Sequence, residues 1–138
     1  MQPASNGGTL EPSWGFGGGF MQLKMNTRDV DGVTVVDCSG RIVFGDESAA
    51  LRENVKKLLE NNKQIVLNLG GVTYIDSGGL GTLVALYTTA RNAGADVKLA
   101  KLTPRVGDLL QVTKLLTVFD VYETEDLAVK AFRTAAVA

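Results

Sequence analysis

The chain has 138 residues, of which 45% are hydrophobic and 21% charged, with a formal net charge of −1, one cysteine and no histidine. This length suits one domain with a hydrophobic core, and the composition argues against a disordered chain, a disulfide scaffold, a zinc site and Ser-His-Asp or Cys-His catalysis. The near-zero charge gives no attraction for nucleic acid, and no apolar run approaches the roughly 20 residues that span a bilayer. We therefore expect a cytoplasmic domain that binds a protein partner, without metal, cofactor, nucleic acid or membrane.

The first 20 residues differ in composition from the rest of the chain. They contain 6 of the 16 glycines, two of the three prolines and the single tryptophan, Trp14. Because neither a strand period nor a helix period is found there, we predict a flexible N-terminal extension over residues 1–20 and a folded domain over residues 21–138. A segment that docks a partner through Trp14, Phe16 and Phe20 is the alternative.

The folded domain is predicted to begin with a β-hairpin. Two extended runs, Met25–Val30 and Val33–Cys38, are joined by Asp31-Gly32, a dipeptide that supplies the positive φ angles of a tight turn. Apolar residues recur on one face of Glu47–Glu60, which predicts a helix. The almost wholly apolar run Ile65–Leu69 predicts a central strand that is covered on both sides.

Helices and strands are predicted to alternate over the second half of the chain. The expected elements are a helix from about Ser77 to Gly94, a strand over Val97–Lys101, a short helix opened by Pro104, a strand over Val118–Tyr122, and a last helix over Glu125–Ala135 with Leu127, Ala131 and Phe132 facing inward. The order β-β-α-β-α-β-α-β-α indicates an α/β fold with a mixed sheet of four to five strands and about four helices.

The segment between the central strand and the second helix contains the candidate chemistry. Asp76, Ser77 and the glycines at 78, 79 and 81 lie beyond the carboxyl end of a strand, where open α/β sheets place their functional residues. The glycines would let another backbone or a ligand approach closely.

Capping of the helix by Asp76 or Ser77 is the structural interpretation. A protease nucleophile is excluded because the chain has no histidine, and a dinucleotide site is disfavoured because Val84 replaces the small third residue of the glycine fingerprint.

A further interpretation makes Ser77 a phosphorylation site. A phosphoserine carries about −1.5 to −2 charges, and the positive end of the helix dipole would accommodate this charge within the domain. The same charge beside Asp76 would oppose burial against a partner, whereas an unmodified serine among glycines permits close packing. Ser77 is therefore predicted to allow binding when it is neutral and to prevent binding when it is charged.

The hairpin, the apolar strand and the motif Asp76-Ser77-Gly78-Gly79-Leu80-Gly81 resemble the STAS domain of bacterial anti-sigma factor antagonists over roughly Gln22–Phe132. The resemblance implies a single STAS-like domain that is not an enzyme. It also implies that Ser77 is phosphorylated by an anti-sigma factor that is itself a serine kinase. The unphosphorylated form would bind this kinase and free a sigma factor, and a PPM-type phosphatase would restore binding. Asp76, Ser77, Gly78 and Gly79 are the partner-binding residues expected at the motif.

Two residues outside the motif are also predicted to contact the partner. The family commonly has Gly, two residues and then Asp in a loop of the partner surface, whereas here Gly40 is followed by Arg41, Ile42 and Val43. The acidic residue comes later, at Asp46, in a loop that should lie near the serine. Arg91 is expected on the exposed side of the second helix.

Several alternatives remain open from the sequence. Lys98, Lys101 and Arg105 form a basic cluster, which is interpreted as a solvated face or as a site that attracts the phosphoserine. Cys38 is expected to be a small buried apolar residue. A STAS subunit of a stressosome-like or lipid-transport complex is the alternative function within the same fold, and a nucleotide-binding enzyme is the alternative outside it.

Overall fold

A β-hairpin opens the described part of the chain, which comprises residues 22–137 of the computed structural model, with side chains described for residues 22–133. Strands β2 (Leu23–Val30) and β3 (Val33–Ile42) pair antiparallel along their length. The turn residues Asp31 and Gly32 have φ angles of 53° and 83°. Both are positive, as a two-residue hairpin turn requires, so the predicted hairpin is confirmed. The flexible extension predicted over residues 1–20 lies outside the described residues.

Three parallel strands continue the sheet: β4 (Gln64–Ile75), β5 (Asp96–Ala100) and β6 (Asp120–Tyr122). The strand order is β2-β3-β4-β5-β6, which confirms the predicted mixed α/β fold. Strand β4 is much longer than the predicted Ile65–Leu69, because its second half continues to pair with β3 across two register shifts. The pairing of β4 with β5 ends at Asn68, so the second half of β4 extends past β5.

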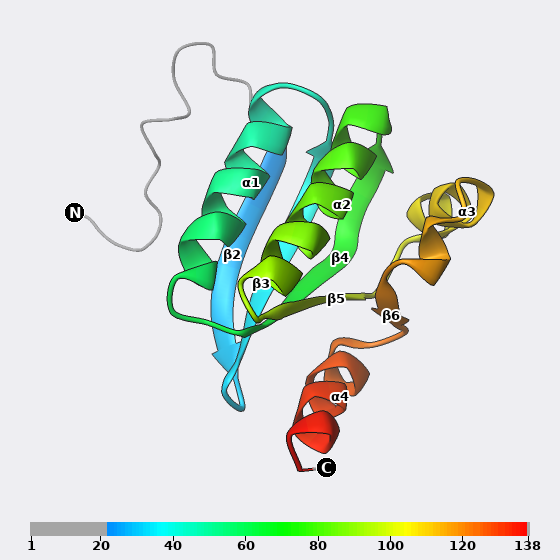
Figure 1. Ribbon diagram of the computed structural model, residues 1–138. Helices are drawn as coiled ribbons and strands as arrows, with labels where there is room; N and C mark the ends of the chain where they lie inside the picture. Colours follow the sequence, from blue (N-terminus) through cyan, green and yellow to red (C-terminus); the bar gives the residue numbers. More distant parts are fainter. Residues whose placement is uncertain (1–21, 138) are drawn as a thin grey trace.

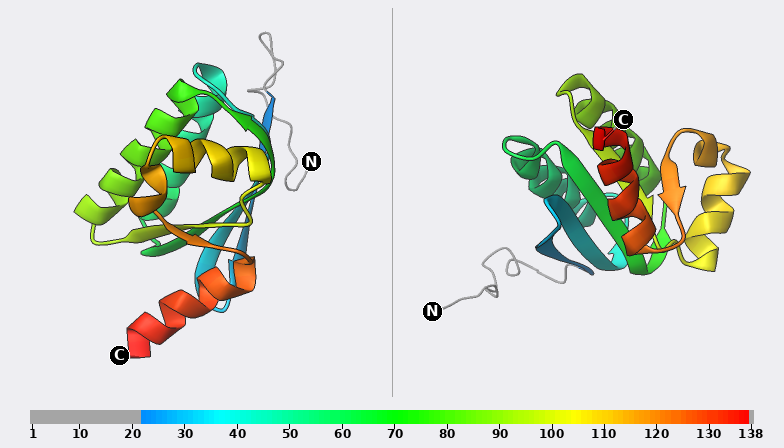
Figure 2. Two further views of the ribbon diagram at one scale, coloured as in Figure 1. Left: turned by 90° about the vertical axis from the view of Figure 1, so that its right-hand side faces the viewer. Right: turned by 90° about the horizontal axis from the view of Figure 1, so that it is seen from below.

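Four α-helices cover the sheet (Figures 1 and 2). They are α1 (Asp46–Leu59), α2 (Ser77–Asn92), α3 (Pro104–Val112) and α4 (Glu125–Val137). Helices α1 and α2 lie side by side over one face, whereas α4 crosses the lower end of the sheet (Figure 1). Each inner strand alternates its side chains between two apolar cores, a large one beneath α1 and α2 and a small one beneath α4. Within residues 22–137, the helices are too short or too polar to span a lipid bilayer.

The structure corrects two predictions near the C-terminus. Strand β6 begins at Asp120 and not at Val118, because the 3-10 helix η2 (Leu115–Thr117) precedes it and the N–H groups of Val118 and Phe119 bond the carbonyl of Leu115. Leu127 is 48% exposed and does not face the core. Phe132 is buried as predicted and Ala131 is partly buried, but the other buried positions of α4 are Ala128 and Val129.

Lys98 does not belong to a solvated basic face, so that interpretation is wrong for this residue. Its side chain is buried on the α4 side of the sheet, where the ammonium group pairs with Asp96 at 3.2 Å and Asp120 at 3.1 Å. The ammonium nitrogen also lies 4.7 Å from the ring centre of Phe132. Cys38 is buried as expected, and its burial raises the pKa of the thiol to about 12, which leaves it protonated at neutral pH.

A polar cluster anchors α4 to the sheet. Arg28 of β2 pairs with Asp37 of β3 and with Glu125 in the first turn of α4. Asn68 of β4 donates a hydrogen bond of 3.0 Å to the same Glu125 carboxylate. The hydrogen bond from Arg28 is the main cause of a lowered pKa of Glu125. This cluster therefore joins three strands to the last helix, β2 and β3 through the guanidinium group of Arg28 and β4 through the amide group of Asn68.

Replacing Arg28 should destabilise the fold in a pH-dependent way. Arg28→Met leaves two neighbouring carboxylates without their shared cation, and we expect a loss of about 1–2 kcal/mol in the free energy of unfolding at neutral pH. Because the pKa of Glu125 is lowered in the folded state, its contribution is present above the unfolded value near 4.3 and is lost as the pH falls through the folded value. Urea unfolding of parent and variant from about pH 7 to pH 3 measures this difference. A difference that did not shrink at acidic pH would contradict the assignment.

Candidate functional site

Ser77 is the first residue of α2 and is exposed just beyond the carboxyl end of β4. The long strand β4 carries the chain past the end of β5 and then turns directly into this helix. Asp76, in extended conformation, is the N-cap. Ser77 is thus an exposed residue at a helix start, and the predicted start of this helix is confirmed.

The carboxylate of Asp76 joins α2 to the loop after β3. Its Oδ1 accepts a hydrogen bond of 2.8 Å from the N–H of Gly79, which confirms the capping interpretation. Both of its oxygens also lie 3.1 Å from the backbone nitrogen of Phe44, which donates to them. These hydrogen bonds, that from Gly79 above all, lower the pKa of Asp76. A negative charge therefore stands directly beside Ser77 at neutral pH.

Two of the three glycines of the motif are required by contacts within the chain. A Cβ atom on Gly79 would lie 2.1 Å from the carbonyl oxygen of Ile42, and one on Gly78 would lie 2.6 Å from the Cβ of Phe44. A Cβ on Gly81 would meet nothing within 4 Å. The expected close approach of another backbone is therefore found at Gly78 and Gly79 but not at Gly81. Gly78 and Gly79 let α2 approach the end of β3, and Gly81 alone faces open space.

Two grooves flank Ser77. The first, which we call the α1–α2 groove, has a volume of about 440 Å³ and is lined by Phe44, Arg52, Gly78 and Gly81, among others. The second, the α2–α3 groove, has a volume of about 660 Å³ and is lined by Asp76, Ser77, Leu80, Arg105, Asp108, Leu109 and Val112, among others. Thr103, the N-cap of α3, donates a hydrogen bond of 3.0 Å to the carbonyl of Val72 and so fixes the start of α3 against β4.

An exposed apolar side chain stands at each groove. Phe44 is 81% exposed and Val112 is 77% exposed. Sequence reasoning missed both residues, because Phe44 reads as the continuation of an apolar strand and Val112 as a buried position of a short helix. The signal that could have identified Phe44 is the glycine that follows it, since Gly45 has a φ angle of 107° and ends the run.

The predicted partner-binding residues do not all lie together. Asp76, Ser77, Gly78 and Gly79 form the corner just described, although Gly79 is buried against Ile42. Asp46 is exposed at the first residue of α1, two positions after Phe44, and so lies at the edge of the same corner.

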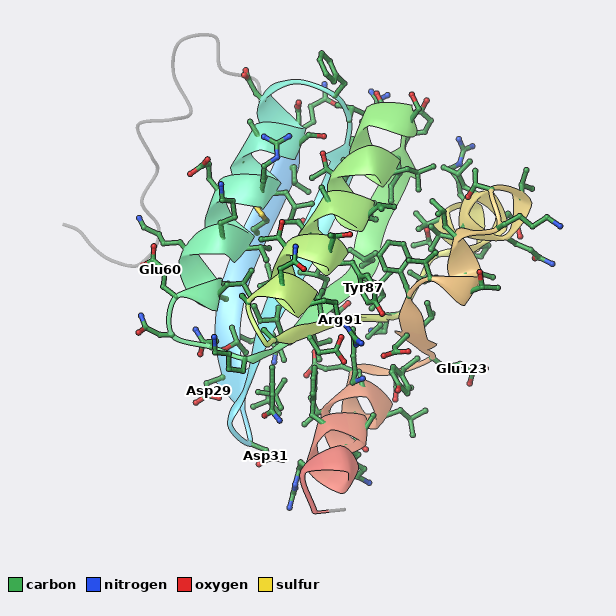
Figure 3. All side chains as sticks on the ribbon, in the orientation of Figure 1. Asp29, Asp31, Glu60, Tyr87, Arg91 and Glu123 are labelled. Carbon is green, nitrogen blue, oxygen red and sulfur yellow. The ribbon has the colours of Figure 1, made fainter. Side chains whose placement is uncertain are left out.

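Arg91 lies far from this corner. It is in the last turn of α2, fourteen residues after Ser77, which corresponds to about 21 Å along the helix. There it lies over the ring of Tyr87 (Figure 3). It also pairs with Asp96. Its contact with a partner stays a prediction, and such a partner would have to extend along the whole of α2.

Comparisons with known proteins agree on one family. The STAS domain family model matches residues 24–128. The anti-sigma-B factor antagonist of Bacillus subtilis is 29% identical over 102 residues, covering 73% of this chain and 88% of that protein. The crystal structure of an anti-sigma factor antagonist from Mycobacterium paratuberculosis is 27% identical, with a TM-score of 0.70, and covers 80% of this chain and 94% of that one.

The same fold has been solved in two modification states. The anti-sigma factor antagonist SpoIIAA in its unphosphorylated form is 17% identical with a TM-score of 0.67, covering 80% of this chain and 97% of that one. The Bacillus cell fate determinant SpoIIAA in its phosphorylated form is 15% identical with a TM-score of 0.63, covering 79% of this chain and 99% of that one. At these identities the likeness concerns the fold alone.

The different surroundings of the glycines predict opposite effects on stability. Gly79→Ala should destabilise the protein by about 1–3 kcal/mol, because the methyl group would displace α2 from the carbonyl of Ile42. Gly81→Ala should stabilise it by up to about 1 kcal/mol, because alanine favours a helix and the space around this position is open. Denaturant unfolding of the two variants measures the difference. Equal losses in both would show that close approach is not the reason for Gly79.

Proposed function

Because this chain belongs to the STAS domain family, we propose that it is an anti-sigma factor antagonist whose binding to an anti-sigma factor is controlled by phosphorylation of Ser77. The observation that carries the proposal is the exposed hydroxyl group of Ser77 at the start of α2, between two grooves that each present an apolar side chain. The named relatives support the class of partner. The protein acts by binding and has no enzymatic activity of its own.

The phosphate group would come from ATP held by the anti-sigma factor, acting as a serine kinase. The Oγ of Ser77 attacks the γ-phosphorus, the bond from this phosphorus to the ADP oxygen breaks, and ADP leaves. The hydroxyl proton passes to a base of the kinase. Asp76 is a poor base for this step because its carboxylate is held by the N–H groups of Phe44 and Gly79 and its pKa is lowered. A PPM-type phosphatase would hydrolyse the phosphoserine and restore the binding form in the cytoplasm.

Phosphorylation would change the charge of the contact surface without disturbing the fold. The unmodified serine is small and neutral, and it permits a partner to approach the first turn of α2. A phosphate group adds about −1.5 to −2 charges at the positive end of the α2 dipole, where the domain itself tolerates an anion. When a partner covers this corner, however, water must leave both the phosphate group and the ionised carboxylate of Asp76. Removing water from two neighbouring negative charges is costly and so opposes binding. Release of the anti-sigma factor would follow from this difference.

Phe44 is the residue that we expect to anchor the partner. Its backbone is held by Asp76 and its Cβ packs near Gly78, yet its ring projects into solvent. A large aromatic ring on a fixed backbone loses little conformational freedom on binding, and such residues dominate the energy of many interfaces. The partner should therefore present an apolar pocket to the loop between β3 and α1.

Variants of Ser77 test the proposed control. With a cognate anti-sigma factor as titrant, Ser77→Ala should still bind, whereas Ser77→Asp should bind roughly tenfold or more weakly, since an uncompensated charge in an interface costs at least about 1.4 kcal/mol. Incubation with the kinase and ATP should add one phosphate to the parent, which mass spectrometry would map to Ser77, and none to Ser77→Ala. Binding of Ser77→Asp as tight as that of the parent, with its fold intact by circular dichroism, would refute the proposal.

Phe44 can be tested independently of phosphorylation. Phe44→Ala removes an exposed ring but keeps the Cβ and the N–H that contact Gly78 and Asp76, so the fold should be unchanged. We expect it to weaken binding of the anti-sigma factor by roughly tenfold or more in the same titration. Leu127→Ala is the matched control, because Leu127 is also an exposed apolar residue but lies on α4, away from Ser77. Equal effects of the two substitutions would exclude a specific role for Phe44.

A further inference from the structure

The α2–α3 groove would receive the phosphate group of a phosphorylated Ser77. Among the described residues that line it, Asp76 and Asp108 are acidic and Arg105 is basic. The carboxylate of Asp76 is held beside Ser77 by its hydrogen bonds to Phe44 and Gly79. A phosphate in this groove would thus be repelled by two carboxylates and attracted by one guanidinium group.

The position of Arg105 is not explained by the stability of α3. Arg105 is the second residue of this helix, directly after Pro104, where the helix dipole disfavours a cation. No acidic residue stands in the first turn of α3. Within the part of the chain whose side chains are described, Arg105 forms no ion pair, and it is exposed at the groove. Its guanidinium group is therefore available to an anion that enters the groove.

We propose that Arg105 binds the phosphate group of phosphorylated Ser77 within the same chain. This inference rests on the proposed function, because it requires phosphorylation of Ser77. A guanidinium group offers paired N–H donors that match two phosphate oxygens, and an exposed arginine side chain can turn along the groove without moving the backbone. The pair would bridge α2 and α3 and fill the groove beside Val112. Phosphorylation would then remove a contact surface in addition to adding charge.

The pKa of the phosphoserine itself reports this contact. The full-length chain can be produced with phosphoserine incorporated at position 77 during translation, and its second ionisation can be followed by phosphorus-31 NMR. A neighbouring cation favours the dianion, so Arg105→Gln should raise this pKa by about half a unit, roughly a threefold change in the ionisation constant. Arg105→Lys should keep most of the parent value, because it keeps the charge.

Arg52→Gln provides the matched control. Arg52 is an exposed arginine of α1 that lines the α1–α2 groove together with Gly78, so the substitution removes the same charge from the other side of the corner. We expect it to leave the phosphoserine pKa unchanged. An unchanged pKa in Arg105→Gln, or an equal rise in Arg52→Gln, would overturn the proposal. Neither result would contradict the proposed function, because no kinase or partner takes part in this measurement.

Discussion

The geometry of the site depends on the close contact between the first turn of α2 and the end of β3. Two glycines allow the helix to approach the carbonyl of Ile42 and the side chain of Phe44, and the carboxylate of Asp76 holds the N–H groups of both segments. These segments are more than thirty residues apart in the chain. One ionised side chain therefore fixes the backbone of Phe44 relative to the start of α2, where Ser77 lies.

The length of β4 determines what surrounds this corner. Because the second half of the strand extends past β5, the start of α2 has no neighbouring strand on one side. Helix α3 lies there instead, and the separation between α2 and α3 leaves the groove beside Ser77. On the other side, small residues of α1 and α2, such as Ala49, Gly78 and Gly81, line the second groove. An exposed serine between two grooves meets the requirement of the proposed function, in which a kinase reaches this serine and a partner covers it.

The sequence predicts the parts of this structure that depend on local chemistry. The turn at Asp31-Gly32, the start of α2 after Asp76 and the alternation of strands and helices follow from backbone preferences and apolar periodicity, and all are confirmed. The features that depend on contacts between distant segments could not be predicted. Examples are the extension of β4 through Gly70 and Gly71, and the pairing of Lys98 with Asp120. A diglycine reads as the end of a strand, and a lysine in an apolar strand reads as exposed, until the partner segment is known.

The same limit applies within the site. Ser77 and Asp76 are recognisable from their order in the chain. The different roles of the three glycines at 78, 79 and 81 are not, because the groups that contact them come from a distant segment. The exposure of Phe44 likewise depends on Gly45 turning the chain away from the core. For this reason the sequence identifies the serine at the start of α2 better than it identifies the surface around it.

Asp76 both caps α2 and sets the charge beside Ser77. Any good capping residue could hold the start of α2, and serine, threonine or asparagine would do so without a charge. An ionised aspartate also places a full negative charge beside Ser77, and its hydrogen bonds keep that charge at neutral pH. A phosphate group then raises the local charge from −1 to about −2.5 to −3. Because the cost of desolvating an ion rises with the square of its charge, this step is far more costly in an interface than the same phosphate beside a neutral cap. If Ser77 is phosphorylated as we propose, the residue that caps α2 also makes the binding of a partner at this corner depend strongly on that phosphate group.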